Sequence, residues 1–350
     1  MLVIACPCAL VISTPVTIVS GLTAAARKGI LIKGGVYLEQ GRKLKALALD
    51  KTGTITHGKP VQTDVMVFNG WSEREVRTTA ASLASYSDHP VSLAIVNASA
   101  DLKKQDVDSF EAIVGRGVHG VITGKDFYLG NLRLTEEHFN CPSEIKATVQ
   151  RLESQGKTVI LLNDGKQVLG LFAVADTVKN SSREAIEQLH ELGVKTIMLT
   201  SDNPHTAKAI ASQVGIDEAR GNQLPEDKHR AVEEHSRIGI TGMVGDGIND
   251  APALAAADIG FAMGAMGTDT AIETADVALM DDDLRKIPAF VKLSRQTYSL
   301  LVQNISLALG IKAVFLVLTL MGMGTMWMAV FADVGASLLV VANGLRLLRK

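Results

Sequence analysis

The chain has 350 residues, room for about two or three domains, and its 47% hydrophobic content suggests that part of it lies in lipid. The 35 Lys and Arg residues nearly balance the 37 Asp and Glu residues, so the net charge of −2 gives no reason to expect nucleic acid as a partner. Three cysteines cannot build a disulfide framework, which excludes a small fold held together by disulfides.

Three apolar stretches are long enough to cross a membrane as helices, at residues 1–22, 298–321 and 326–346. Arg27 and Lys28 follow the first stretch and Arg346 ends the third, whereas the turn at Gly322–Gly324 carries no charge. Basic residues favour the cytoplasmic side of a membrane. The sequence therefore predicts a multi-pass protein of the plasma (inner) membrane, with the long segment between the first two spans in the cytoplasm.

Within that segment, short apolar runs alternate with helical patterns. The runs cover residues 44–49, 195–199, 241–244 and 259–263, and helical patterns cover residues 181–192 and 204–214. This rhythm predicts an α/β fold with a parallel sheet, whose ligands collect at the carboxyl ends of the strands.

The rhythm changes between residues 59 and 170, where short strands and helices are separated by glycine-containing turns. We expect this stretch to be a separate α+β domain inserted into the sheet domain. The sheet domain then consists of residues 23–58, which include the connection from the membrane, and residues 171–292.

Asp50 follows the first apolar run and is a candidate nucleophile. A carboxylate can attack phosphorus when Mg²⁺ and a cation reduce the repulsion between the two anions. Asp246 and Asp250, together with Asp50, offer the carboxylate oxygens that Mg²⁺ prefers. Thr200 and Lys228 are candidates for holding the phosphoryl oxygens. The sequence thus predicts phosphoryl transfer to Asp50.

The residue two positions after the nucleophile separates a pump from a phosphatase, because an aspartate there would protonate the leaving group and later activate water. Here that residue is Thr52. The phosphorylated chain would lack a built-in general acid or base and would persist long enough to drive a conformational change. Thr52 therefore favours energy transduction over simple hydrolysis.

The run Asp50–Thr56 resembles the phosphorylation motif of P-type ATPases, and Pro225–Lys228 resembles the phosphate-binding lysine motif of that family. Membership would imply a haloacid-dehalogenase-like phosphorylation domain, an inserted nucleotide-binding domain, and ATP and Mg²⁺ as cofactors. Where the family usually has Thr-Gly-Asp, this chain has Thr200, Ser201 and Asp202, and by resemblance Asp202 belongs to the nucleotide site.

The segment Gly115–Gly120 matches a GxGxxG pattern, yet residues 118–128 alternate like a strand and do not open a helix, which argues against a dinucleotide fold. With the upstream pair His89-Pro90, it instead resembles the glycine motif of heavy-metal (type IB) P-type ATPases. Taken alone, His89 reads as a residue that begins a helix. The resemblance implies that ATP contacts His89, Glu111, Gly115 and Gly117.

Cys6 and Cys8 flank Pro7 inside the first span, where local unwinding would expose thiolates that select soft or borderline metals. Lys312 and Asp333 lie at matched depth on the two sides of the outer turn, so we expect them to pair. A carboxylate suits a divalent ion better than Cu(I). These residues resemble those of the zinc, cadmium and lead exporting branch, which implies Zn²⁺, Cd²⁺ or Pb²⁺ as the exported ion, with Cys6, Cys8, Lys312 and Asp333 at its site.

The resemblance covers the whole chain but only about half of a full pump, because the family carries further spans and an actuator domain with a Thr-Gly-Glu loop that is absent here. We therefore interpret the chain as a C-terminal part, with membrane lipid, ATP, a transition-metal ion and the N-terminal half of the pump as partners. Three alternatives remain: a Cu(I)-type exporter, a haloacid-dehalogenase-type phosphohydrolase and an inactive pump remnant.

Overall fold

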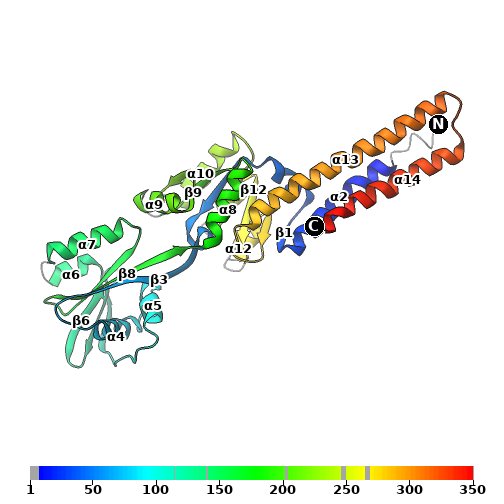
Figure 1. Ribbon diagram of the computed structural model, residues 1–350. Coiled ribbons are helices and arrows are strands. Elements are labelled where there is room, and N and C mark those ends of the chain that lie inside the picture. Colours follow the sequence, from blue (N-terminus) through cyan, green and yellow to red (C-terminus); the bar gives the residue numbers. More distant parts are fainter. Residues whose placement is uncertain are drawn as a thin grey trace.

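A computed structural model describes residues 8–113, 115–138, 141–201, 204–245, 250–264 and 269–349. Cys6, Asp202 and Asp246, which the sequence assigns to candidate sites, lie outside the described residues. The molecule is elongated: two sheets with their helices occupy one end, and three long helices form the other (Figure 1).

The first sheet has seven strands in the order β1-β13-β12-β11-β2-β9-β10. Neighbouring strands run parallel, except that β1 pairs antiparallel with β13. The central strands are buried along their whole length, because hydrophobic clusters cover both faces of the sheet. The strands are β1 (Ile30–Ile32), β2 (Ala46–Asp50), β9 (Lys195–Leu199), β10 (Glu218–Arg220), β11 (Thr241–Gly245), β12 (Ile259–Met263) and β13 (Val277–Leu279).

Helices connect these strands, as the expected α/β rhythm requires, and the α/β prediction is confirmed. The two helices expected from the pattern are present as α8 (Asn180–Glu191) and α9 (Pro204–Val214). The others are α3 (Gly35–Gln40), η1 (Gly41–Lys43), α10 (Pro225–Ser236), α11 (Ala251–Ala256) and α12 (Asp269–Thr274).

The second sheet is antiparallel throughout, in the order β3-β8-β7-β6-β5-β4. Helices α4 (Glu73–Ala84) and α5 (Pro90–Ala98) pack on one face and α7 (Ser143–Glu153) on the other. The strands and the remaining helix are β3 (Thr56–Val67), β4 (Asp108–Ile113), β5 (Gly117–Ile122), β6 (Lys125–Gly130), β7 (Thr158–Asn163), β8 (Val168–Val178) and α6 (Leu132–His138).

Residues 118–128 form a hairpin, so the expectation of a single strand there was wrong. Thr123 and Gly124 both have positive φ, 51° and 77°, as a two-residue hairpin turn requires. The alternation of apolar and polar residues does not by itself reveal where the chain reverses.

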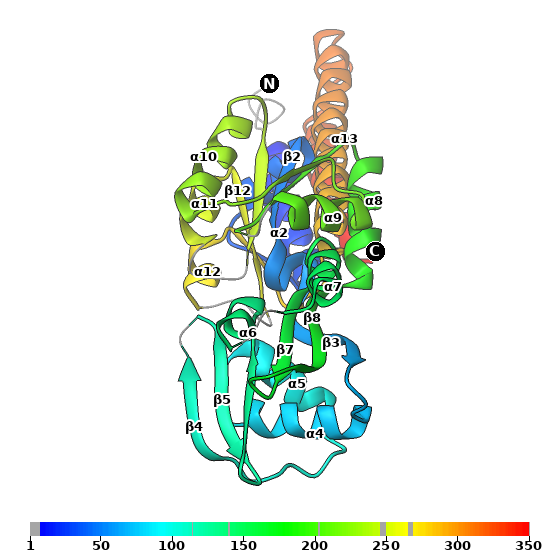
Figure 2. The ribbon, with the colours of Figure 1, turned by 90° about the vertical axis from the view of Figure 1, so that its left-hand side faces the viewer.

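Strands β3 and β8 join the two sheets as one long antiparallel pair, registered from Thr56 opposite Val178 to Val67 opposite Gly170. They lead from the first sheet to the second and back (Figure 2). The expected domain boundaries, at 58/59 and 170/171, fall inside these two strands. The second sheet is therefore attached through a continuous ribbon.

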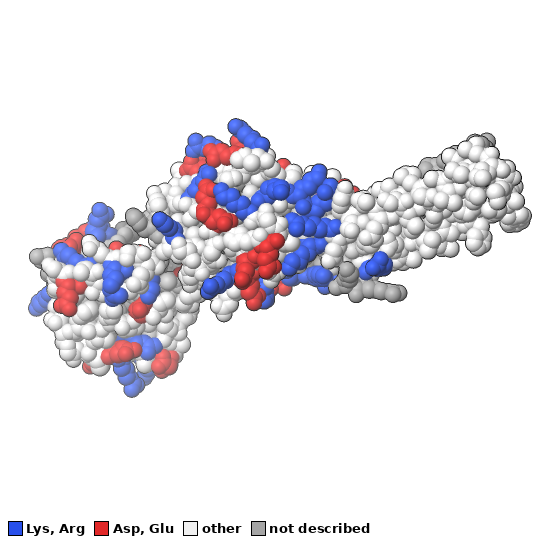
Figure 3. All heavy atoms as spheres, turned by 45° about the horizontal axis from the view of Figure 1, so that its top comes forward, with Lys and Arg blue, Asp and Glu red and all other residues white. Residues whose placement is uncertain are grey.

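Three helices of the described chain are long and apolar enough to cross a membrane: α2 (Cys8–Arg27), α13 (Lys286–Leu320) and α14 (Met326–Gly344), which continues into η4 (Leu345–Arg349). Helix α13 has 35 residues and begins twelve residues before the expected span at 298–321. The first part of α13 belongs to the sheet domain, because Ile287, Phe290 and Val291 are buried in the core of the first sheet. Lys and Arg side chains gather where the sheets meet the helices, and the helical end is almost free of charge (Figure 3).

Candidate functional site

Asp50 is the last residue of β2 and lies almost buried at the carboxyl end of the first sheet. Lys228, in the first turn of α10, donates hydrogen bonds from Nζ to Asp50 and to Asp250 Oδ1, the latter at 2.8 Å. The side chains of all three residues are at most 10% exposed. Three residues far apart in sequence thus converge on one point, as the strand-end argument predicts.

The electrostatics of this cluster hold Lys228 in its charged form. Burial alone would lower the pKa of Lys228, but the carboxylates of Asp50 and Asp250 outweigh burial and raise it. The ammonium group in turn offsets the repulsion between the two carboxylates, which lie within reach of one cation. The cluster is a buried, net acidic site.

Thr200 follows β9, next to β2 in the sheet, where Asp50 is registered opposite Leu199. Its backbone N–H donates to Arg220 O at 3.1 Å, and its carbonyl accepts from Gln223 N at 2.9 Å. These bonds fasten the end of β9 to the segment that leads into α10, so Thr200 and Lys228 lie on the same edge as Asp50. Ser201 is exposed.

The turn after Asp50 is held by contacts that the sequence did not indicate. Gly53 has a φ of 72°, and its carbonyl accepts a hydrogen bond of 2.6 Å from Nζ of the buried Lys179. Thr56 donates to Lys51 O and to Asp176 at the end of β8. The available signal was the polar residues Asp176, Thr177 and Lys179, which lie where β8 ends and α8 begins.

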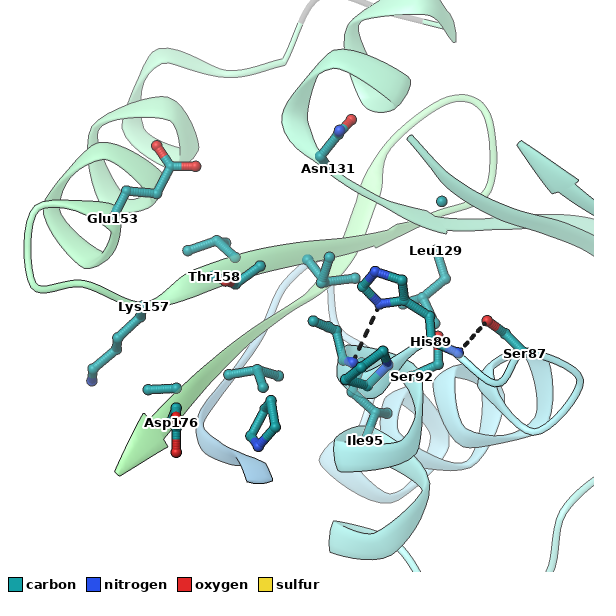
Figure 4. A pocket seen from close by; sticks show the side chains of 18 of the residues that line it. Ser87, His89, Ser92, Ile95, Leu129, Asn131, Glu153, Lys157, Thr158 and Asp176 are labelled. Carbon is teal, nitrogen blue, oxygen red and sulfur yellow. Dashed lines mark hydrogen bonds between the residues drawn. The ribbon is translucent and has the colours of Figure 1, made fainter. Parts of the chain in front are cut away.

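A cavity of about 920 Å³ lies between the two sheets, and it brings His89, Gly115 and Gly117 together with Lys51 and Thr52. Figure 4 shows the His89 ring reaching into this space, opposite Lys157 and Asp176. His89 also caps helix α5, since its Nδ1 accepts from Val91 N at 3.3 Å. His89 therefore begins a helix, as its sequence context predicts, and also lines the cavity.

Glu111 does not line the cavity, although the resemblance grouped it with His89. It is exposed on β4, registered opposite His119, whereas Ala112 and Ile113 line the cavity. The sequence also missed Asn131, a cavity residue that donates to Gly115 O at 3.1 Å.

In the helical end, Lys312 Nζ lies 3.5 Å from Asp333 Oδ1, so the expected pairing is confirmed. Both side chains are about one-fifth exposed. Ala9, adjacent to Cys8, packs with Ala308 and Ala336, which lie one helical turn from Lys312 and Asp333 respectively. Among the described residues, no group of three or more His, Cys, Asp or Glu could hold a metal ion.

Comparison with known proteins shows similarity to haloacid dehalogenase-like hydrolases and to P-type ATPases. Residues 44–258 match the family of haloacid dehalogenase-like hydrolases. The chain is similar to a probable cadmium-transporting ATPase of Alkalihalophilus pseudofirmus, with 47% identity over 358 residues that cover 100% of this chain and 50% of that protein. It is also similar to the zinc/cadmium/lead-transporting P-type ATPase of Escherichia coli K12, with 46% identity over 100% of this chain and 47% of that protein.

Among solved structures, the fold is similar to that of a zinc-transporting PIB-type ATPase in its E2.Pi state, with a TM-score of 0.92 and 46% identity. The match covers 99% of this chain and 57% of that one. The chain spans about half the length of the curated relatives that it matches.

Proposed function

Because the chain belongs to the heavy-metal P-type ATPases, within the haloacid dehalogenase-like hydrolases, we propose that it forms the catalytic and ion-binding part of an ATP-driven exporter of Zn²⁺, Cd²⁺ or Pb²⁺. Asp50 accepts the phosphoryl group of ATP in this proposal. The observation that carries it is the buried contact of Lys228 with both Asp50 and Asp250 at the carboxyl end of a parallel sheet.

The chemistry follows from this cluster. A carboxylate oxygen of Asp50 attacks the terminal phosphorus of ATP, the bond from that phosphorus to ADP breaks, and ADP leaves with the bonding electron pair. Lys228 offsets the negative charge that gathers as the two anions meet. Thr200, at the end of the neighbouring strand, is placed to hold a phosphoryl oxygen.

The acidic residues fit a magnesium ion, since Asp50 and Asp250 present carboxylate oxygens at one buried point and Mg²⁺ prefers oxygen ligands. Asp246, outside the described residues, belongs to the same sequence run. When bound there, Mg²⁺ would neutralise phosphate charge.

ATP fits the cavity between the sheets, where the segment from Gly115 to Gly117 and His89 lie opposite the turn that follows Asp50. Thr52 lines the same cavity. A threonine cannot take a proton from water at neutral pH, so the aspartyl phosphate lacks the built-in base of a phosphatase. This argues for a transporter and against a simple phosphohydrolase.

The transported ion is proposed to bind near Cys8, Lys312 and Asp333, with Cys6 as a further thiolate. An ion pair inside a membrane span is costly and by default functional. The carboxylate of Asp333 favours a divalent ion over Cu(I), and Lys312 balances that carboxylate when the ion has left. Basic side chains gather where the sheets meet the helices (Figure 3). Arg27, Lys28 and Lys33 lie at and just after the end of α2. The positive-inside rule therefore supports a cytoplasmic location for the sheets.

The test is labelling of the purified chain with γ-labelled ATP, with and without Zn²⁺, beside an Asp50→Asn control. We expect acid-stable, hydroxylamine-sensitive label on the wild type only, increased by Zn²⁺ or Cd²⁺. A folded, ATP-binding chain that takes up no label would contradict the proposal. Hydrolysis of small phosphate esters without metal dependence would point to a phosphohydrolase, and stimulation by Cu(I) alone would point to the copper branch.

A further inference from the structure

A chain of hydrogen bonds joins the three long helices at a level between the first sheet and the Lys312–Asp333 pair. We name the side chains of Thr17 (α2), Asn304 (α13) and Asn343 (α14) the amide junction. Asn304 Nδ2 donates to Thr17 Oγ1 at 3.1 Å, and Asn343 Nδ2 donates to Asn304 Oδ1 at 2.8 Å. One residue from each helix therefore takes part.

The junction is closed at both ends, so each amide has its partners. Thr17 Oγ1 donates onward to Ser13 O at 2.7 Å, and Arg346 Nη1 donates to Asn343 Oδ1 at 2.9 Å. The donors all run in one direction, an arrangement in which each bond strengthens the next. Thr17 and Asn304 have no exposed surface, so a lost partner would leave a buried polar group unsatisfied.

The backbone is also shaped for this contact. A Cβ atom added at Gly344, the residue after Asn343, would lie 3.1 Å from Thr17 Oγ1. The end of α14 can thus approach α2 closely because position 344 has no side chain. This approach is independent of the hydrogen bonds and fixes the same point of contact.

The junction lies at a matched depth on all three helices. Asn304 is eight residues from Lys312, Asn343 ten from Asp333 and Thr17 nine from Cys8, which is about 12 to 15 Å along each helix. Between the two polar levels the helices meet through small apolar side chains, namely Ala9, Ala308, Ala336 and Val340. Small apolar side chains offer little resistance to one helix sliding along another. The hydrogen bonds of the amide junction therefore set the register of the three helices.

Helix α13 connects this junction to the phosphorylated domain without a break. Phe290, in its first part, is fully buried in the core of the first sheet, and the same helix carries Asn304 and then Lys312. A displacement of that sheet therefore reaches Lys312 along α13. Asn304 lies between the two, at the level where α13 is bonded to α2 and α14.

We infer that Asn304 is a positioning residue, which fixes the register of α13 against α2 and α14 and so aligns Lys312 with Asp333 and Cys8. The consequence for the ion rests on the proposed function, whereas the register does not. The substitution Asn304→Leu keeps the approximate volume and removes both hydrogen bonds. Gln296→Leu is the matched control, since it also replaces an amide by leucine on α13, at an exposed position eight residues before Asn304 and outside the junction.

The register is measured directly by pulsed EPR on the full chain, with Cys6, Cys8 and Cys141 replaced by Ser and spin labels at Val314 and Val334. These positions are 59% and 54% exposed, one on α13 and one on α14. We expect Asn304→Leu to shift or broaden the distance distribution by several Å, up to about one helical turn of ~5.4 Å, and Gln296→Leu to leave it unchanged. An unchanged distribution in Asn304→Leu would overturn the inference.

A second pair of variants tests the same hydrogen bonds in case Asn304→Leu folds poorly. Thr17→Val removes the acceptor with almost no change in shape, and Thr17→Ser keeps the hydroxyl. We expect Thr17→Val to alter the label distance and Thr17→Ser to preserve it. Equal behaviour of the two variants would show that packing, and not the hydrogen bond, sets the register.

The functional experiment measures how ATP labelling depends on Zn²⁺ concentration in the chain with its native cysteines. The half-maximal Zn²⁺ concentration should rise about tenfold in Asn304→Leu and stay constant in Gln296→Leu, because loss of a supporting contact typically weakens metal binding by about 10- to 100-fold. A shifted register with an unchanged Zn²⁺ dependence would contradict the alignment of the ion site. Absence of label in the wild type would sink the proposed function, and the EPR distances would still decide the register.

Discussion

The Nζ atom of Lys228 lies 2.8 Å from Asp250 Oδ1 and also donates to Asp50, so one ammonium group joins the end of β2 to the start of α11. Replacing it by Met leaves two buried carboxylates facing each other without a cation. We expect Lys228→Met to lower the rate of Asp50 phosphorylation by about 100-fold or more. Rapid-quench labelling with ATP measures that rate.

The matched control is Arg230→Met, on the same helix, whose side chain is 70% exposed and pairs with Asp227 only at the surface. It should leave the phosphorylation rate within about twofold, since exposed pairs contribute little. Similar rates for wild type and Lys228→Met would mean that the lysine serves only the packing of α10.

Lys179 offers a second test, because it holds the turn after Asp50 through its bond to Gly53 O. Lys179→Met should lower the free energy of unfolding by about 1 to 3 kcal/mol, the cost of leaving a buried polar group without its partner. It should also slow the labelling of Asp50. Chemical denaturation of the detergent-solubilised chain measures the first effect.

Lys195→Met is the comparison for that experiment, since Lys195 pairs with Glu218 at the surface and its side chain is 47% exposed. Its loss should cost less than about 1 kcal/mol. If both variants lost the same stability, the buried contact of Lys179 would have no special part in the fold.

The central strands could be predicted from the sequence because both faces of the sheet are covered, which makes each strand a continuous apolar run. The edge strands β1 and β10, and β13 beside β1, have three residues each, too few to show a period. Hydropathy likewise predicted only the part of α13 that is apolar enough to cross a membrane. Its first twelve residues are held by the core of the first sheet, which only tertiary structure reveals.

The phosphorylation cluster was predictable for a topological reason, since parallel strands deliver their last residues to one edge. That argument groups Asp50 with Thr200 at one edge, whereas Lys228, on helix α10, joined them through the resemblance of Pro225–Lys228 to a phosphate-binding motif. It could not supply Lys179 or Asp176, whose contacts with the turn depend on how β8 returns from the second sheet. It also does not reach Glu111, which lies exposed on β4 and does not line the cavity.

The two cavity glycines should respond differently to alanine, because both have positive φ but only Gly117 is closely packed. A Cβ at Gly117 would lie 2.3 Å from Leu129 O, whereas a Cβ at Gly115 would meet nothing within 4 Å. Gly115 has a φ of 71°, so Gly115→Ala should cost about 1 to 2 kcal/mol of stability from strain alone. Gly117→Ala should cost more, because β5 would be forced away from β6.

Unfolding curves and ATP affinity together check this pair. We expect Gly117→Ala to weaken ATP binding along with stability, since the cavity wall itself moves. Gly115→Ala should change ATP affinity only if a ligand approaches the backbone at that position. Equal losses of stability in the two variants would contradict the predicted close approach of β5 and β6.

His235 makes stability depend on pH near the last turn of α10, the helix that carries Lys228. Burial is the main cause that lowers its pKa, and among the described residues its Nε2 is buried without a hydrogen-bond partner. In the unfolded chain the imidazole has its ordinary pKa of ~6.5, so the unfolded chain binds a proton more readily than the folded chain does. The stability that neutral His235 provides is fully present above about pH 6.5 and is lost as pH falls through the folded pKa.

Replacing this imidazole by a side chain that does not titrate should flatten the dependence. We expect His235→Gln to lose less stability than wild type between pH 7.5 and 5.5, by at most about 1.4 kcal/mol per pH unit, the limit for one proton. Denaturation midpoints measured across that range give the difference. Because burial and not a neighbouring charge is the leading cause, 0.5 M salt should leave most of the difference in place. Parallel pH curves for the two chains would show that His235 gains its proton as readily folded as unfolded.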